Sequence, residues 1–124
     1  MAKLQIFHAD EEAWTRYDEH TPLQFKVHHP GSDEELQLFE IELDPGESIE
    51  VHAHDESEII YILEGELQLG ARRVGRGSSV AIPGRTLYGF IAGPDGVRFL
   101  NFRGRQDTTF YTKDQFMAAR SSQP

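Results

Sequence analysis

Residues 46–65, GESIEVHAHDESEIIYILEG, decide the fold. His52 and His54 are two residues apart, and Glu58 follows four residues later. Side chains two apart on a strand share a face, so an extended segment here places both imidazoles on one side. Glu58 joins them if the chain turns at residues 55–57 and returns on the neighbouring strand. Two imidazoles and one carboxylate suit a divalent first-row metal and leave coordination positions open.

The sequence on either side of this stretch alternates short strand patterns with turn signals. The patterns predict strands at residues 25–29, 36–43, 48–54, 59–63, 78–82, 87–92 and 97–102, and a further strand and hairpin at 65–74. Turns are predicted at 30–33, 44–46, 64–65, 83–84 and 93–96. The run 59–63 is continuously apolar, which predicts a strand buried on both faces. These features indicate an all-β antiparallel sandwich or barrel. Periodicity alone leaves a jelly roll, an immunoglobulin-like sandwich and an up-and-down barrel open.

Both ends of the chain have helix signals. Residues 10–17 predict a short helix, with Asp10 as its N-cap. Thr112 and Gln115 are placed as a capping box for a helix from residue 113 to about 120.

The length, composition and net charge of the chain limit the classes of protein to which it can belong. The 124 residues suffice for one domain, and no apolar run is long enough to cross a bilayer. The absence of cysteine excludes disulfides and thiolate chemistry. A net charge of −9 disfavours non-specific binding to nucleic acid or to an anionic membrane. The N-terminus has no long apolar segment and becomes acidic within ten residues, so a cytoplasmic location is expected.

A family resemblance now narrows the choice of fold. Gly46, His52, His54, Glu58 and Gly65 fill every fixed position of the first motif of the cupin family. Five residue types at fixed offsets, coinciding with strand and turn signals, make this motif highly specific. The resemblance covers roughly residues 25–103, which is most of the chain.

The second cupin motif is only partly present. Gly77 and Pro83 match it, but Arg85 stands where a glycine is expected. Tyr88 takes the place of the motif's histidine, and Ala92 replaces its asparagine.

In cupins the two histidines and the glutamate of the first motif, with the histidine of the second, bind one metal ion. The resemblance therefore implies His52, His54 and Glu58 as ligands, with Tyr88 at the fourth position. Three arrangements stay open: three ligands and water with Tyr88 close by, Tyr88 as a phenolate ligand, or a site that is empty or binds metal weakly. His28 or His29 could also replace the missing histidine.

Inward and outward faces follow from the alternation along each strand. Ile60 and Ile62 share the parity of Glu58 and are expected to line the cavity, whereas Tyr61 packs on the opposite face. Four aromatic residues are predicted to lie in the core, where one or two of them could form an apolar pocket wall: Phe39, Phe90, Phe99 and Phe102. A role for Arg103 and Arg105 in holding an anionic substrate is open.

The resemblance implies a single domain, residues 1–124, folded as a double-stranded β-helix or jelly-roll barrel. The core barrel covers about 25–103, after an N-terminal arm, 1–24, and before a short C-terminal helix at about 113–120. The implied function is binding one divalent ion (Zn, Fe, Mn or Ni) and acting on a small molecule as an oxygenase, isomerase or lyase. Tyr88 is then the catalytic candidate for proton transfer. The alternative is a metal-free or weakly metal-binding cupin that binds or senses a small molecule. A homodimer is also implied.

Overall fold

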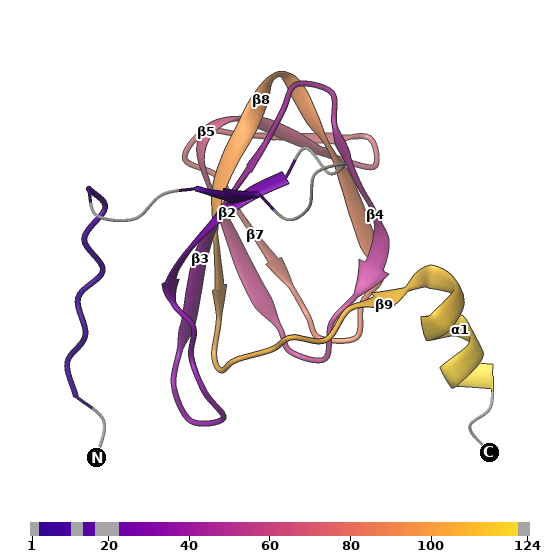
Figure 1. The fold of residues 1–124 in the computed structure, drawn as a ribbon. Coiled ribbons are helices and arrows are strands. Elements are labelled where there is room, and N and C mark those ends of the chain that lie inside the picture. Colours follow the sequence, from indigo (N-terminus) through magenta and orange to yellow (C-terminus); the bar gives the residue numbers. More distant parts are fainter. Residues whose placement is uncertain (1–2, 11–13, 17–22, 122–124) are drawn as a thin grey trace.

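The computed structural model describes residues 3–10, 14–16 and 23–121. Most of this part of the chain forms strands that curl into a barrel (Figure 1). The strands are β1 (Thr15–Arg16), β2 (Leu23–His29), β3 (Gln37–Leu43), β4 (Ser48–Ala53), β5 (Glu58–Leu69), β6 (Arg72–Gly75), β7 (Ser79–Ile82), β8 (Tyr88–Arg103) and β9 (Tyr111–Thr112). A helix, α1 (Lys113–Ser121), follows them.

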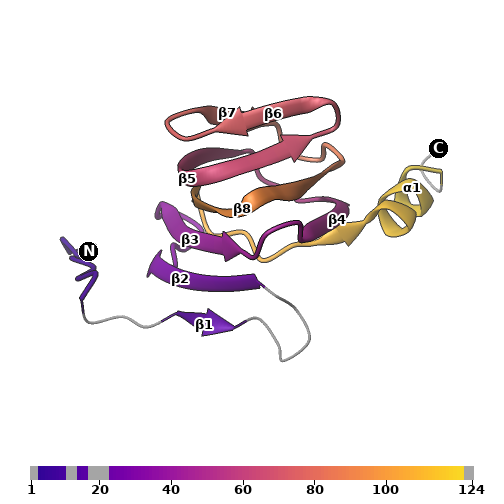
Figure 2. The same cartoon turned by 90° about the horizontal axis from the view of Figure 1, so that it is seen from above.

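The described strands are joined in one antiparallel sheet built around β5 and β8. The sheet runs β1-β2-β3-β8-β4-β9, and β5 pairs with β6, β7 and β8. Seen from above, β5 and β8 lie between the β6–β7 end and the β2–β1 end of the curled sheet (Figure 2). Because β8 pairs with β3, β4 and β5, it brings residues from all three strands to the interior.

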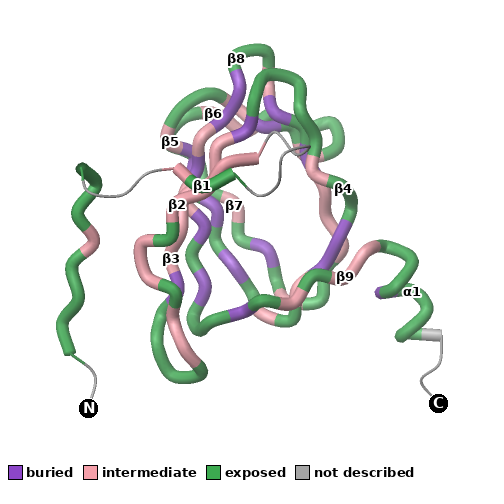
Figure 3. Tube along the Cα trace, viewed as in Figure 1, coloured by how far each residue is buried: buried purple, intermediate pink, exposed green. Residues whose placement is uncertain are grey.

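Burial alternates along the strands (Figure 3). In β5, Ile60 and Ile62 are buried while Ile59 and Tyr61 are almost half exposed. The prediction of a strand buried on both faces is therefore wrong, because no second layer covers the outer side of β5 in the described structure. Tyr61 does face away from Glu58, but it is not packed. Phe90 and Phe99 are in the core as predicted. The core prediction is wrong for Phe102, which is 37% exposed on the outer side of β8.

Two predicted turns are instead bends within long strands. Residues 64–65 lie inside β5, and residues 93–96 lie inside β8. Gly65 (φ +74°) and Gly96 (φ +80°) take backbone conformations that other residues rarely adopt, and they lie against each other where the two strands bend. The glycines thus mark the corner of the barrel rather than the end of a strand.

The C-terminal helix begins as the sequence predicts. The Thr112 hydroxyl accepts a hydrogen bond from the Gln115 N–H, and the Gln115 side chain accepts one from the Thr112 N–H. The N-terminal prediction fares differently, since Thr15 and Arg16 form strand β1 rather than helix, and residues 11–13 and 17 lie outside the described residues. In the described part of the chain α1 is the one helix, and it is neither long nor apolar enough to cross a membrane.

Candidate functional site

The barrel encloses a cavity of about 750 Å³. Its apolar wall is formed by Leu23, Phe25, Val27, Phe39, Ile41, Ile49, Ile60, Phe90 and Phe99. Its polar lining includes Gln37, His52, His54, Tyr88, Asn101, Arg103 and Asp107. A cavity of this size, mostly apolar with a few converging polar groups, is typical of a small-molecule site.

Strand register collects the polar groups at one end of the barrel. Arg103 lies opposite Gln37 on β3 and opposite Glu58 on β5. Two residues deeper along β8, Asn101 faces Phe39 and Ile60. Beyond that level the inward residues of β8 and β3 are Phe99, Val97, Ile41 and Leu43. The lining therefore changes from polar to apolar along the barrel axis.

The two histidines of the first motif lie together, as their spacing predicts. Their ring centroids are 4.8 Å apart, with the rings nearly perpendicular. His52 is the last residue but one of β4, and His54 follows just beyond the end of the strand. A bulge between Ile49 and His52 breaks the simple alternation, so that Ile49 lines the cavity with the histidines instead of facing away from them.

Hydrogen bonds fix the tautomer of both imidazoles. Nδ1 of His52 contacts the Glu50 carbonyl oxygen at 2.6 Å, and Nδ1 of His54 contacts the Thr109 carbonyl oxygen. A carbonyl oxygen can only accept, so each Nδ1 carries the proton. In the neutral rings both Nε2 atoms are then lone-pair acceptors. Burial lowers the pKa of His52, and the hydrogen bond to Glu50 offsets part of that effect, so the neutral form is favoured.

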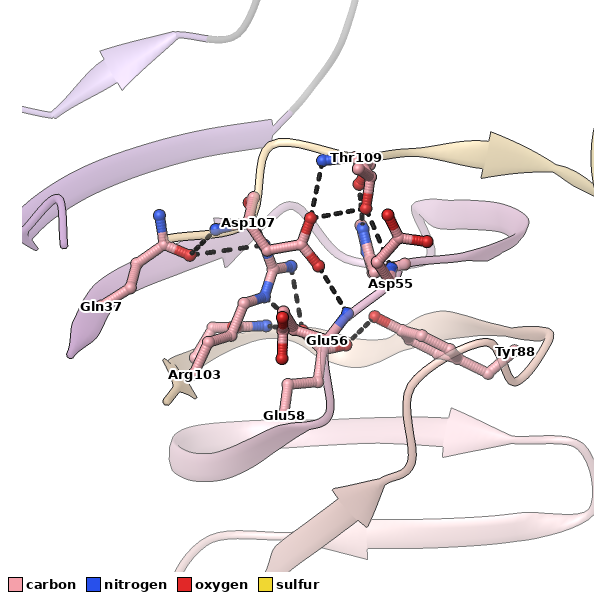
Figure 4. Close-up of polar contacts among 10 residues, drawn as sticks. Gln37, Asp55, Glu56, Glu58, Tyr88, Arg103, Asp107 and Thr109 are labelled. Carbon is pink, nitrogen blue, oxygen red and sulfur yellow. Dashed lines mark hydrogen bonds and ion pairs between the residues drawn. The ribbon is translucent and has the colours of Figure 1, made fainter. Parts of the chain in front are cut away.

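Four donor contacts converge on the buried Glu58 carboxylate. Oε2 accepts hydrogen bonds from Arg103 Nε at 2.9 Å and from Asn101 Nδ2 at 3.0 Å, and it forms an ion pair with Arg103 Nη2 at 2.9 Å. Oε1 accepts from the Tyr88 hydroxyl (Figure 4). A carboxylate has about four lone-pair sites, so these contacts are close to its capacity. The Arg103 guanidinium supplies the positive charge beside Glu58.

Tyr88 connects the carboxylate with the histidine pair. Its ring centroid is 4.5 Å from that of His52, and its hydroxyl donates to Glu58. Burial raises the pKa of Tyr88 well above its ordinary value, and the adjacent negative charge of Glu58 raises it further. The hydroxyl therefore stays protonated in this arrangement.

A loop from residue 104 to 110 is tied across the polar end. Arg103 Nη1 donates to the Asp107 carbonyl oxygen at 2.7 Å. The Asp107 carboxylate accepts from the N–H groups of Glu56 and Thr109 and from the Thr109 hydroxyl (Figure 4). Burial acts to raise the pKa of Asp107, but these hydrogen bonds and the charge of Arg103 outweigh it and hold the pKa below its usual value. The loop thereby places the Thr109 carbonyl against His54.

The structure tests whether a metal ion suits these residues. Within residues 3–10, 14–16 and 23–121, no three His, Asp or Glu side chains are placed to hold one ion together. For Glu58 to bind a metal, it would have to exchange contacts that it now makes with Arg103, Asn101 or Tyr88. The residues as they lie thus do not form the ligand set that the resemblance implies. Metal binding by His52, His54, Glu58 and Tyr88 stays a prediction.

His28 and His29 do not line the cavity. His28 Nε2 contacts Glu40 Oε1 at 2.8 Å, and its ring stacks on Phe7. His29 lies instead beside an outer groove next to the N-terminal arm. Ile60 lines the cavity as predicted, whereas Ile62 is packed in the core.

Sequence reasoning missed several residues of the site. Asn101 had a usable signal, because it shares the inward parity of Val97 and Phe99. Arg103 continues that parity and is buried, but it pairs with Glu58 and is not left for an anionic substrate. The roles of Asp107 and Thr109 depend on a loop without periodicity, so no pattern in the sequence reveals them.

Arg85, which stands where the second cupin motif has a glycine, takes a backbone conformation that is unfavourable for a non-glycine residue. Its φ of 58° lies in the left-handed region, where a glycine is favoured, and no other non-glycine residue in the described chain has a positive φ. Its N–H donates to the His54 carbonyl, and its guanidinium contacts Asp55 at 3.0 Å. This residue thus helps to hold the segment that carries His54.

Known structures resemble this architecture closely enough to identify the fold. KdgF from Halomonas sp. is 24% identical, with 82% of this chain and 96% of that chain covered and a TM-score of 0.67. The polyketide cyclase RemF from Streptomyces resistomycificus is 22% identical over 95% and 94% of the two chains, with a TM-score of 0.72. A putative acetylacetone dioxygenase from Methylibium petroleiphilum PM1 is 13% identical over 93% and 85%, with a TM-score of 0.77.

These likenesses confirm the jelly-roll barrel. None of the curated proteins matches the chain. The family model described as "Cupin domain" matches residues 39–102, which is more than half of the sequence. The chain therefore belongs to the cupin family.

Proposed function

We propose that this cupin binds a small, largely apolar molecule in the barrel, with the polar end of that molecule against His52, His54 and Tyr88. One observation carries the proposal: the 750 Å³ cavity has apolar walls that lead to polar groups gathered at one end. Apolar walls supply affinity, and a few placed polar groups set the orientation of the ligand.

The same groups could serve acid–base chemistry on the bound molecule. The Nε2 atoms of His52 and His54 can accept a proton, because each Nδ1 already carries one. Tyr88 is the proposed catalytic residue for proton transfer, since it lines the cavity and its hydroxyl contacts the Glu58 carboxylate. An isomerase or lyase reaction would use a proton relay of this kind.

The binding proposal is tested with a neutral fluorescent probe, N-phenyl-1-naphthylamine. Ile49→Trp places a larger side chain in the cavity and is expected to weaken binding of the probe at least about tenfold. Val51→Trp on the same strand is the matched control, because Val51 is exposed and lines no part of the cavity. Thermal unfolding checks that both variants fold. Absence of saturable binding to the unchanged protein, or equal binding by the two variants, contradicts the proposal.

A metal-dependent small-molecule enzyme is the second candidate. It is favoured by the two Nε2 lone pairs, because a hydrogen bond from Nδ1 is how metal-binding imidazoles are commonly oriented. His52 and His54 would hold the ion, and Zn, Fe, Mn or Ni all suit such ligands. When bound, the ion would polarise a substrate oxygen or bind dioxygen. The solved cupin-like structures include an oxalate decarboxylase from Bacillus subtilis as well as the putative dioxygenase.

Elemental analysis of the purified protein tests this candidate. About one ion per chain is expected, and the His52→Ala, His54→Ala double variant should lose it, whereas His28→Ala should keep it. Less than one-tenth of an ion per unchanged chain, or full occupancy in the double variant, contradicts metal binding at this site.

We also propose that two copies of the chain pair as a homodimer and that the protein works in the cytoplasm. The first point is supported by apolar side chains exposed on the outer side of β5 and β8, including Ile59, Tyr61 and Phe102.

A further inference from the structure

Apart from two exposed hydroxyls, the side-chain hydrogen-bonding groups without a partner in the described cavity lining are acceptors. From this we infer that the ligand is an aromatic molecule bearing a hydrogen-bond-donating hydroxyl, as in a phenol, and is neither a carboxylate nor a phosphate. The inference rests on the proposed small-molecule function and adds the chemical class of the ligand. It depends on three sets of contacts: those of the donors, those of the acceptors and those of the aromatic wall.

The donor side chains in the interior of the cavity each have at least one partner. Arg103 donates to Glu58 and to the Asp107 carbonyl, and Asn101 Nδ2 and the Tyr88 hydroxyl also donate to Glu58. Gln37 Nε2 donates to the Pro30 carbonyl at 3.0 Å.

Among the described lining residues, the exposed hydroxyls of Ser48 and Thr108 are the donor groups without such a partner. The positive charge of Arg103 is matched by Glu58, with side chains only 7% and 1% exposed. An anionic ligand would therefore meet no unpaired cation in the interior, and its desolvation would be uncompensated.

The acceptors are in the opposite situation. His52 and His54 present Nε2 lone pairs, since their Nδ1 protons go to backbone carbonyls. Asn101 lines the cavity and is 3% exposed, and its Oδ1 is buried without a hydrogen-bond partner. Buried polar atoms are nearly always paired in folded proteins, so an unpaired acceptor at a cavity wall indicates a missing donor. A ligand hydroxyl supplies such a donor.

Aromatic side chains set the shape of the ligand. Phe25, Phe39, Tyr88, Phe90, Phe99 and Phe110 line the cavity. Phe110 stacks on His52 with ring centroids 4.5 Å apart and planes 10° apart, and Phe90 meets Phe99 edge to face. Rings arranged in this way favour a flat aromatic partner, which can stack or pack edge to face.

Three ligands of nearly equal size test the inference: 2-naphthol, 2-methoxynaphthalene and 2-naphthoate. Isothermal titration calorimetry should show 2-naphthol binding at least about tenfold more tightly than the methyl ether, which keeps the oxygen but has no donor. The carboxylate should bind more weakly than 2-naphthol as well. Titrations are repeated after EDTA treatment. A preference for 2-naphthol that disappears with EDTA overturns the inference, because a bound metal rather than an imidazole would then recognise the hydroxyl.

Variants locate the preference within the cavity. His52→Phe and His54→Phe keep a ring but remove the Nε2 acceptor, so the double variant should lose most of the tenfold preference for 2-naphthol over its methyl ether, with Asn101 Oδ1 as the acceptor that remains. His28→Phe, outside the cavity, should keep the tenfold preference. A tenfold preference that survives undiminished in the double variant overturns the inference.

The outcomes also separate this inference from the function on which it rests. If the unchanged protein binds all three ligands equally, or binds 2-naphthoate most tightly, the inference fails while small-molecule binding stands. If it binds none of the three and also fails to bind N-phenyl-1-naphthylamine, both fail.

Discussion

The pairing of Glu58 with Arg103 has the largest expected effect on stability among the single contacts of the site. Arg103→Met leaves a carboxylate buried without its cation, and we expect the free energy of unfolding to fall by about 3–5 kcal/mol. Urea denaturation at neutral pH measures the change. Arg105→Met removes a partly exposed contact with Glu56 and should cost less than about 1 kcal/mol. Equal losses for the two variants would show that the buried pair is not important for stability.

A second variant separates charge burial from loss of packing. In the Arg103→Met background, Glu58→Gln removes the unpaired negative charge, so the double variant should recover part of the lost stability. A double variant less stable than Arg103→Met alone would mean that the methionine packs poorly rather than that the carboxylate is uncompensated.

At the residue scale, the sequence predicts where side chains lie along a strand better than it predicts which residues they contact on other strands. The spacing of His52 and His54 requires only the two-residue period of a strand, and the structure brings their rings together. The partner of Glu58 could not be predicted, because Arg103 meets it only through the register of β5 against β8. A one-residue shift of that register would turn Arg103 to the outer face.

Among the elements, β5 depends on a glycine at its bend. Gly65 has a φ of +74°, and a Cβ there would collide with the carbonyl of Gly96 in β8. We expect Gly65→Ala to lower the free energy of unfolding by at least about 3 kcal/mol, from backbone strain plus displacement of β8. Gly46→Ala is the matched control, because Gly46 has a φ of +75° but open space around it, and should cost about 1 kcal/mol. Chemical denaturation of both variants measures the two losses in the free energy of unfolding, and similar losses would contradict the crowding argument.

The same bend explains why the predicted strands were too short. Residues 64–65 and 93–96 have the composition of turns, and turn chemistry is a local signal. Whether a glycine ends a strand or bends it depends on the neighbouring strand, and here β5 and β8 pair on both sides of the glycines, with register shifts at 62–64 and 65–67. Helix α1 was predicted closely because its capping box and its length are local features.

For the whole molecule, the family pattern predicts the barrel but not the side chains that gather at the polar end of its cavity. Five fixed positions of one motif are enough to place the strands around the interior. The polar end depends on side chains from β3, β8 and the loop after β8, among them Gln37, Asn101 and Asp107. Their convergence is a product of the closed barrel, so strand patterns taken one at a time do not reveal it.

Assembly is the property of the whole molecule that the outer surface predicts. Ile59 and Phe102 are paired across β5 and β8, and Tyr61 lies two residues further along β5. All three side chains are 37–46% exposed, and they form an apolar surface on the side of the sheet away from the cavity. Burying this surface against a second copy is favourable, so light scattering should give about twice the chain mass of 14.1 kDa.

Ile59→Lys with Tyr61→Lys places two charges in that contact and should shift the mass to that of one chain. Gln68→Lys adds a charge at an exposed position of the same strand outside the apolar surface, and it should leave the dimer intact. Because these side chains face away from the cavity, the double variant should still bind the neutral fluorescent probe, which shows that it remains folded. A single-chain mass for the unchanged protein, or a double variant that remains dimeric, would exclude this surface as the interface.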